Sequence, residues 1–163
     1  MARCDWKRPT DFPLQAGFRR IRITVSYDGA AFSGWQRQHD ARSVQAEIED
    51  ALHTMLKTHV RVQGSGRTDA KVHAIGQVAH FDIENHSVPE QAFALALNQL
   101  LPHDIRIIES QQVDEHFHAR FTCVAREYRY YVKEEKDFTP FDRGRTAKMR
   151  IFPPLELLNS YAS

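Results

Sequence analysis

Apolar and polar residues alternate along several short stretches of the chain, which is the pattern of half-buried β-strands. In residues 20–27, RIRITVSY, every second side chain from Ile21 to Tyr27 is aliphatic or aromatic. One face of this stretch is therefore predicted to lie against a core. The same pattern predicts five strands: residues 20–27, the stretch around Val60 and Val62, and residues 77–83, 105–113 and 127–133.

Apolar residues at helical spacing follow the first and third predicted strands. Ser43 is a suitable N-cap for an amphipathic helix over residues 44–58. A second helix is predicted to have Pro89 in its first turn and to stop at Pro102. This order predicts an α+β fold, a mostly antiparallel sheet with helices on one face, for which ferredoxin-like topology is the simplest template.

These elements predict one α+β domain over residues 20–150, preceded by a polar N-terminal extension, residues 1–19. After the prolines at 153 and 154, LELLNSYAS begins an apolar helical face, and the sequence stops within about two turns. Residues 151–163 are therefore expected to start a second half. The chain is expected to be a fragment or a truncated gene product.

Composition indicates the size of the protein's core and its cellular location. With 42% hydrophobic and 26% charged residues, 163 residues are enough for one compact domain with a core. Two cysteines, Cys4 and Cys123, and a start without an apolar signal segment favour a reduced, cytoplasmic setting. No apolar run approaches the roughly 20 residues of a membrane span, so no membrane partner is expected.

The formal net charge of +1 does not indicate a nucleic-acid partner by itself. The basic residues are nevertheless unevenly distributed, with one group between Arg19 and Arg42 and another between Arg120 and Arg150. Either these groups are ordinary solvated surface, or the fold brings them to one face as a phosphate-binding stripe.

Residues 64–74, GSGRTDAKVHA, form a glycine-containing loop between two predicted strands. Asp69 can act there as a nucleophile, because glycines let a ligand approach the backbone and Arg67 could keep the carboxylate ionised. From the residues alone, an Asx-turn in which Asp69 bonds its own backbone is the more ordinary interpretation. His73 and His80 are expected to be satisfied histidines rather than ligands, because neither an HExxH motif nor a CxxC pair is present, and no metal site is predicted.

An aromatic and basic run, EYRYYV over residues 127–132, has the composition expected where a nucleobase stacks on a ring and a cation holds its phosphate. In a strand, Tyr128 and Tyr130 would share one face. One face of that strand can equally be core, which is the interpretation we prefer for Tyr130. Residues 116–121, HFHARF, could likewise belong to the core or contact RNA. In this stretch Arg120 is the residue expected to be functional.

Seven stretches between Arg22 and Val132 together resemble the TruA-type transfer-RNA pseudouridine synthases. They occur in the family's order: YDGAAFSGWQRQ (27–38), SVQ (43–45), GRTDAKVHA (66–74), GQVAHF (76–81), NQLLPHDI (98–105), FHARF (117–121) and REYRYYV (126–132). One such stretch would be weak evidence, but all of them in order make the resemblance specific. It implies the fold of one pseudouridine synthase half.

The resemblance implies that the protein isomerises uridine to pseudouridine in the anticodon arm of transfer RNA, without a metal, nucleotide or organic cofactor. It also implies roles for three residues: Asp69 as the essential nucleophile, Arg67 in drawing the target nucleotide out of its stack, and Tyr128 in packing against the target uracil. Members of this family are homodimers that hold RNA in basic clefts. Transfer RNA and a second copy of the chain are therefore the expected partners.

The chain departs from the family pattern in two respects. Lys71 stands where a glycine is usual, so the loop is expected to differ slightly or the lysine to contact phosphate. Family members also continue into a second, similar half, which includes an arginine that pairs with the catalytic aspartate. The 163-residue chain is therefore expected to be inactive by itself, and its full-length parent to be active.

Two other functions stay open at this stage. A non-catalytic RNA-binding module would keep the fold and the basic face, and would not need the aspartate, the arginine and the tyrosine in this arrangement. A metal-dependent hydrolase would require ligands to converge from among Asp69, His73, His80 and His118.

Overall fold

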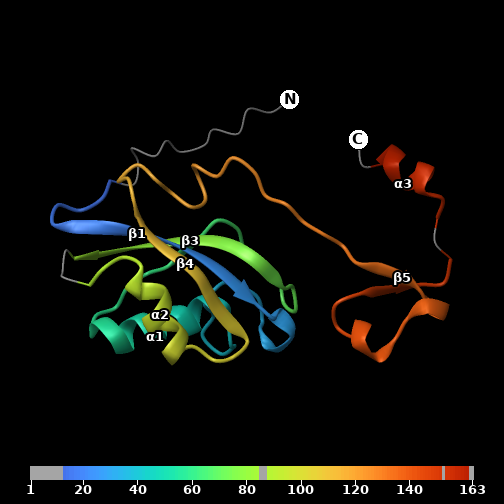
Figure 1. Cartoon of the computed structure of the whole chain (residues 1–163), viewed down its shortest axis with the longest axis horizontal. Coiled ribbons are helices and arrows are strands. Elements are labelled where there is room, and N and C mark those ends of the chain that lie inside the picture. The colour runs from blue at the N-terminus through green and yellow to red at the C-terminus, as the bar shows by residue number, and fades with distance from the viewer. Residues whose placement is uncertain (1–12, 85–87, 152, 162–163) are drawn as a thin grey trace. The chain divides into compact units, whose positions relative to one another are not determined.

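The computed structural model describes residues 13–84, 88–151 and 153–161, and the chain divides after Val124 into two compact units. Each unit is described by itself. The first contains a four-stranded antiparallel sheet (Figure 1). Its strands are β1 (Phe18–Tyr27), β2 (Gln63–Gly64), β3 (Ala74–Glu84) and β4 (Ile105–Val113).

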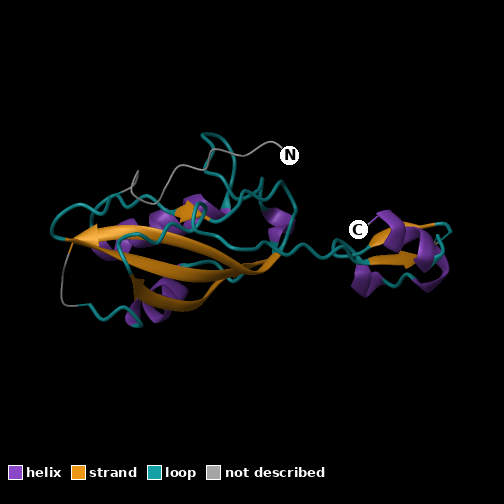
Figure 2. Cartoon of the chain, turned by 90° about the horizontal axis from the view of Figure 1, so that it is seen from above, coloured by secondary structure: helices purple, strands orange, loops and turns teal. Residues whose placement is uncertain are grey.

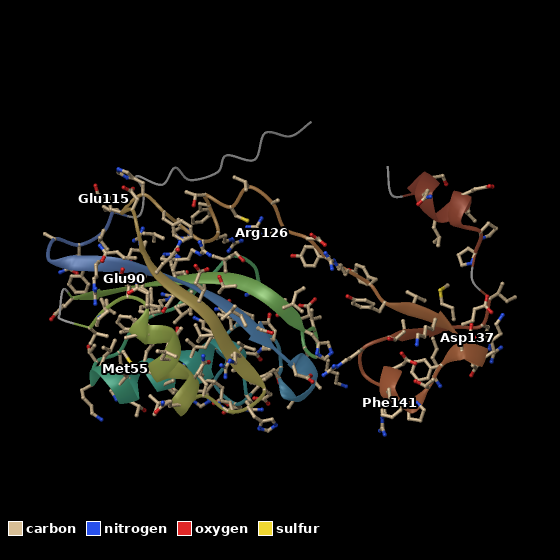
Figure 3. The ribbon with its side chains drawn as sticks, viewed as in Figure 1. Met55, Glu90, Glu115, Arg126, Asp137 and Phe141 are labelled. Carbon is tan, nitrogen blue, oxygen red and sulfur yellow. The ribbon has the colours of Figure 1, made fainter. Side chains whose placement is uncertain are left out.

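Two helices of the first unit, α1 (Val44–Leu56) and α2 (Ala92–Leu100), lie on the same side of this sheet (Figure 1). In Figure 3, Met55 marks α1 and Glu90 marks the turn before α2. The strand order is β2-β3-β1-β4, with α1 between β1 and β2 and α2 between β3 and β4. This is the ferredoxin-like arrangement, so the predicted α+β class, antiparallel sheet and one-sided helices are confirmed.

The core of the first unit lies between the sheet and the two helices, as the apolar periodicity predicts. Ile21, Ile23 and Val25 of β1 are fully buried at every second position, as alternation in a strand requires. Ile48 and Leu52 of α1 belong to the same buried cluster and recur at helical spacing. The apolar periodicity of the strands and helices is therefore enough to explain which face of the sheet packs against which face of the helices.

The ends of some elements differ from the predictions. α1 begins where predicted, because the Ser43 hydroxyl caps it by accepting the Ala46 N–H at 3.4 Å. The second predicted strand is reduced to Gln63–Gly64, the two residues of this stretch that pair with β3. Val60 and Val62 are instead buried in the core cluster, so their apolar character reflects packing rather than strand pairing.

The face of the sheet away from the helices binds the segment that follows β4. Arg20 of β1, only 3% exposed, donates to both carboxylate oxygens of Asp82 at 2.7 Å. It also donates to the carbonyl oxygens of Glu115 and Phe117 at 2.8 and 2.7 Å. A single buried guanidinium, neutralised by one carboxylate, thus ties residues 115–117 to β1 and β3.

Two buried histidines extend this polar cluster. His80 Nδ1 accepts the Ala119 N–H at 3.2 Å, and His118 Nδ1 accepts the N–H groups of Arg120 and Phe121 at 3.2 and 3.3 Å. Burial, with His118 close by, lowers the pKa of His80 to about 3, and burial also lowers the pKa of His118. Both rings are therefore neutral acceptors at pH 7, and the prediction that His80 is a satisfied core histidine is confirmed.

The second unit, which begins at Ala125, combines short helices and short strands with irregular segments (Figure 2). It contains the parallel pair β5 (Val132–Glu134) and β6 (Ala147–Met149) and the helix α3 (Leu155–Tyr161). Short 3-10 turns between the strands are marked in Figure 3 by Asp137 and Phe141. α3 begins where the sequence predicts an apolar helical face, and β6 was not predicted.

The predicted strand over residues 127–133 is wrong in its extent, because β5 includes only its last two residues. A sequence with high β-propensity forms a strand only where a partner strand is available. The partner of β5 is β6, which is three residues long, so β5 is equally short. Tyr128 and Tyr130 therefore do not share a sheet face. Tyr130, which we expected in the core, is 89% exposed.

Three remaining expectations concern the chain ends and the membrane. Residues 1–12 of the predicted N-terminal extension, including Cys4, lie outside the described residues, and Cys123 is partly buried. No helix in the described part of the chain is both long and apolar enough to cross a membrane. The predicted boundaries at residues 19 and 150 stay predictions.

Candidate active site

The loop of residues 65–73, called the Asp69 loop below, joins β2 to β3 and carries the predicted nucleophile. Asp69 is exposed, and its carbonyl oxygen accepts the Val72 N–H at 3.3 Å. Within the described residues, nothing donates a hydrogen bond to its carboxylate or forms an ion pair with it. The Asx-turn interpretation is therefore wrong, because the side chain does not bond its own backbone.

Residues 27–35, called the clamp segment below, hold the Asp69 loop on the N-terminal side of the aspartate. The Trp35 N–H donates to the Thr68 carbonyl oxygen at 3.0 Å. The Tyr27 hydroxyl, at the end of β1, lies 2.7 Å from Thr68 Oγ1. Because Thr68 directly precedes Asp69, both contacts restrict the backbone from which the carboxylate projects.

The clamp segment also holds the loop on the C-terminal side of the aspartate. The Lys71 N–H donates to the Phe32 carbonyl oxygen at 3.2 Å. The Gly29 N–H donates to Nδ1 of His73 at 3.2 Å, and the same nitrogen lies 3.0 Å from an Asp28 carboxylate oxygen. Both flanks of the candidate nucleophile are thus tied to one segment.

Two glycines let the clamp segment come this close. A Cβ atom at Gly29 would lie 2.0 Å from the Val72 carbonyl oxygen. A Cβ atom at Gly34, where φ is +103°, would lie 2.6 Å from the Thr68 carbonyl oxygen. The YDG and SGW stretches of the sequence therefore carry glycine because the loop backbone occupies the space of a side chain.

Lys71 takes the backbone conformation that a glycine would favour. Its φ is +66°, in the left-handed region, where a residue with a Cβ is strained by roughly 1 kcal/mol. The loop therefore follows a path with a left-handed residue at this position even though the residue is lysine. Its side chain is exposed, which is compatible with the predicted phosphate contact.

Arg67 lies two residues before Asp69 and is also exposed. In the described chain it forms no ion pair with Asp69. The two side chains are therefore not directly paired, and the predicted effect of Arg67 on the Asp69 carboxylate stays a prediction. The Arg67 side chain is exposed to solvent.

The other predicted site residues lie outside the Asp69 loop. Arg120 is exposed, and its N–H is held by His118 on the face of the sheet away from the helices. Tyr128 is 63% exposed and belongs to the second unit. Its place relative to Asp69 stays a prediction.

The first group of basic residues is largely paired with carboxylates of the same unit. The nearest N–O distances are 2.7 to 3.0 Å in the pairs Arg20–Asp82, Arg22–Glu109, Arg37–Glu49 and Arg42–Asp104. These pairs do not support a phosphate-binding stripe made of those four arginines. The corresponding role of the group from Arg120 to Arg150 stays a prediction.

The histidines near the sheet bind backbone N–H groups. His73, His80 and His118 each accept at least one such hydrogen bond. Among the residues that the structure describes, no three His, Cys, Asp or Glu side chains converge as metal ligands. The hydrolase alternative therefore has no ligand set in this part of the chain.

Sequence reasoning missed two residues that contact the Asp69 loop: Tyr27, through Thr68, and Gln77, whose amide nitrogen donates to the Gly66 carbonyl oxygen at 3.0 Å. The apolar alternation places Tyr27 in the core, where it is 3% exposed, and nothing in that pattern addresses its hydroxyl. The signal that could have found it is its type and place: a buried phenol needs a polar partner, and this one ends a strand beside a turn.

Comparison with known proteins bears on this site directly. A family model described as tRNA pseudouridine synthase matches residues 23–122, which include the clamp segment and the Asp69 loop. A protein named tRNA pseudouridine synthase A from Oceanobacillus iheyensis is 48% identical over 126 residues, 77% of this chain and 49% of the relative.

Two further relatives with the same name agree. The protein of Bacillus pumilus is 50% identical over 126 residues, 76% of this chain and 51% of the relative. That of an Exiguobacterium species is 41% identical over 140 residues, 86% of this chain and 56% of the relative. The chain thus spans about half the length of the curated relatives it matches. Since the family model covers more than half of the chain, the chain belongs to the tRNA pseudouridine synthase family.

Proposed function

We propose that the protein isomerises uridine to pseudouridine in transfer RNA, with Asp69 as the nucleophile. The observation that carries this proposal is the Asp69 loop, whose backbone is tied to the clamp segment on both flanks while the carboxylate has no partner in the described chain. A nucleophile must reach the substrate and yet be held in place, and this arrangement meets both needs. The family membership supports the substrate class.

The proposed reaction exchanges one bond to the ribose for another. The bond between C1′ of the ribose and N1 of uracil breaks, the base turns, and a bond forms between C1′ and C5. C5 loses its proton and N1 gains one, so atoms and electrons balance without an oxidant or a reductant. Asp69 attacks either the sugar or the base, and its exposed carboxylate is compatible with both.

Three other residues are proposed to bind the RNA. Extruding a base from its stack costs a few kcal/mol, and Arg67, exposed two residues from Asp69, is proposed to help draw the nucleotide out. Tyr128 is proposed to stack on the target uracil, since its ring is exposed. Arg120 is proposed to contact a phosphate.

Finer features of the proposal rest on the resemblance of the motifs. We propose the anticodon arm as the substrate region, a homodimer as the working assembly and the cytoplasm as the location. The chemistry calls for no metal, nucleotide or organic cofactor, because a carboxylate nucleophile and two proton transfers complete the isomerisation.

The test deletes the gene in its own organism, replaces Asp69 by Asn in a parallel strain, and maps pseudouridine in transfer RNA from both. We expect the same positions to revert to uridine in both strains, because the Asp69→Asn exchange removes the nucleophile and keeps the shape. RNA affinity of the purified variant should stay within about twofold. Asp137→Asn, an exposed aspartate of the second unit, is the matched control and should retain every pseudouridine.

Two outcomes would contradict the proposal. Pseudouridine that survives the Asp69→Asn exchange at positions lost on deletion would show that Asp69 is not the nucleophile. Unchanged pseudouridine after deletion would support the alternative of a non-catalytic RNA-binding module.

A further inference from the structure

Tyr27 places a hydroxyl inside the first unit. It is the last residue of β1 and is 3% exposed, and its ring packs against Trp35 with ring centroids 6.1 Å apart and planes at 40°. A buried phenol oxygen requires a hydrogen-bond partner. Because packing holds the ring, it also decides where this oxygen lies.

Two side chains share the Tyr27 hydroxyl. Thr68 Oγ1 lies at 2.7 Å and Gln77 Oε1 at 3.2 Å. The Gln77 amide nitrogen donates to the Gly66 carbonyl oxygen at 3.0 Å, so the other end of this amide must be the acceptor. Tyr27 therefore donates to Gln77 and accepts from the Thr68 hydroxyl.

Both contacts reach the Asp69 loop just before the aspartate, at Thr68 directly and at Gly66 through the glutamine. Thr68 is held a second time at its carbonyl oxygen, by the Trp35 N–H at 3.0 Å. The peptide that joins Thr68 to Asp69 is thus fixed through its oxygen and through the adjoining side chain. The Asp69 carboxylate has no partner of its own in the described chain, so this backbone determines where it projects.

We propose that the Tyr27 hydroxyl is a positioning group for Asp69, acting through the hydroxyl of Thr68. The inference rests on the proposed function for what Asp69 does, and on the contacts above for how it is held. Tyr27 touches the loop rather than the substrate. Its effect on turnover comes through geometry, where a displacement of about 1 Å can cost roughly a hundredfold in rate.

The first experiment measures amide hydrogen exchange in the 163-residue chain and in the variants Tyr27→Phe and Thr68→Val, each of which removes one hydroxyl and keeps the side-chain shape. We expect exchange at residues 68–72 to become faster by about tenfold, while the amides of α1 keep their rates. Thr54→Val is the matched control, because among the residues described the Thr54 hydroxyl bonds only within α1, to the Asp50 carbonyl oxygen at 2.9 Å.

The second experiment introduces the same exchanges into the gene and measures pseudouridine in transfer RNA. Tyr27→Phe and Thr68→Val should both slow its formation, and the double variant should be no slower than the slower single variant, because the two hydroxyls form one bond. Thr68→Ser keeps a hydroxyl at this position. It should restore both the exchange rates and the pseudouridine level, which a general loss of packing would not do.

The outcomes separate the two proposals. Unchanged loop exchange in both Tyr27→Phe and Thr68→Val overturns the positioning role, whatever the activity. Faster loop exchange with full pseudouridine formation overturns the link between loop position and turnover. If the unaltered gene supports no pseudouridine at all, the proposed function fails, and the exchange data alone decide whether Tyr27 holds the loop. Should Tyr27→Phe not fold, Thr68→Val carries the same test, because Thr68 is not part of the core cluster.

Discussion

Gly34 shows how one residue controls the separation between the clamp segment and the Asp69 loop. The atoms that a Cβ would meet there, the Thr68 oxygen at 2.6 Å and the Asp69 carbonyl carbon at 3.2 Å, belong to the backbone and cannot rotate away. Its φ of +103° adds conformational strain for any other residue. Gly17 also has a positive φ, +83°, but a Cβ there would meet no atom within 4 Å.

Replacing each of these two glycines by alanine separates the cost of backbone strain from the cost of a steric clash. We expect Gly17→Ala to lower the free energy of unfolding by about 1 kcal/mol through backbone strain alone. Gly34→Ala should cost about 2 to 4 kcal/mol, since overpacking adds to the strain, and should displace the Asp69 loop. Urea unfolding of the two variants measures the difference. If both variants lost the same free energy of unfolding, the close approach of Gly34 to the Thr68 carbonyl oxygen would not contribute to stability.

Among the elements, the segment of residues 115–122 depends on neutral imidazoles. Its N–H groups at Ala119, Arg120 and Phe121 find acceptors on two histidines, and its carbonyl oxygens find a donor on Arg20. Protonation of either ring would remove an acceptor and add a charge close to the buried guanidinium. The attachment of this segment should therefore be sensitive to acid.

The pH dependence of folding follows from the lowered pKa of His80. The unfolded chain binds this proton near pH 6.5 and the folded chain only near pH 3, so acid favours the unfolded state between these values. From pH 7 to pH 4.5, His80 alone should lower the free energy of unfolding by about 2 kcal/mol.

Urea unfolding at both pH values, for the unaltered chain and for His80→Gln, isolates this contribution. Glutamine keeps an acceptor for the Ala119 N–H and does not titrate, so the variant should lose about 2 kcal/mol less over the same interval. An identical pH dependence in both proteins would show that His80 is not the group responsible.

For the whole molecule, the division into two units after Val124 has a direct consequence for proteolysis. Residues 124–131 are exposed and have no regular secondary structure. Proteases cut exposed irregular backbone before they cut a sheet. Trypsin should therefore cleave first after Arg126 or Arg129, and leave a resistant product that contains the four-stranded sheet.

A time course followed by mass spectrometry checks this expectation. Replacing both arginines, as in Arg126→Gln with Arg129→Gln, should delay the first cut several-fold without changing the melting of the sheet. Earlier cleavage after Arg106, which lies within β4, would show that the first unit opens before the irregular residues are cut.

Local pattern predicted much of the first unit, because burial of Ile21, Ile23 and Val25 at every second position needs only one strand face against a core. The loop that carries Asp69 could also be located, from its glycines and its place between two strands. The run of Tyr128 to Tyr131 was assigned wrongly, because strand formation depends on a partner that the run itself does not contain. Arg20 was counted as a surface cation, and its burial follows from Asp82, which is 62 positions away.

The sequence by itself determined the order of the strands and helices in the first unit, the motifs of the family and the identity of the candidate nucleophile, since each of these resides in neighbouring residues. Only the tertiary structure decided that the Tyr27 hydroxyl meets Thr68, 41 positions along the chain, and that Arg22 pairs with Glu109 across 87 positions. Contacts between residues so far apart leave no local periodicity. They form because the sheet and the clamp segment bring the partners together, and the contact of Tyr27 with Thr68 holds the backbone next to Asp69 without touching its carboxylate.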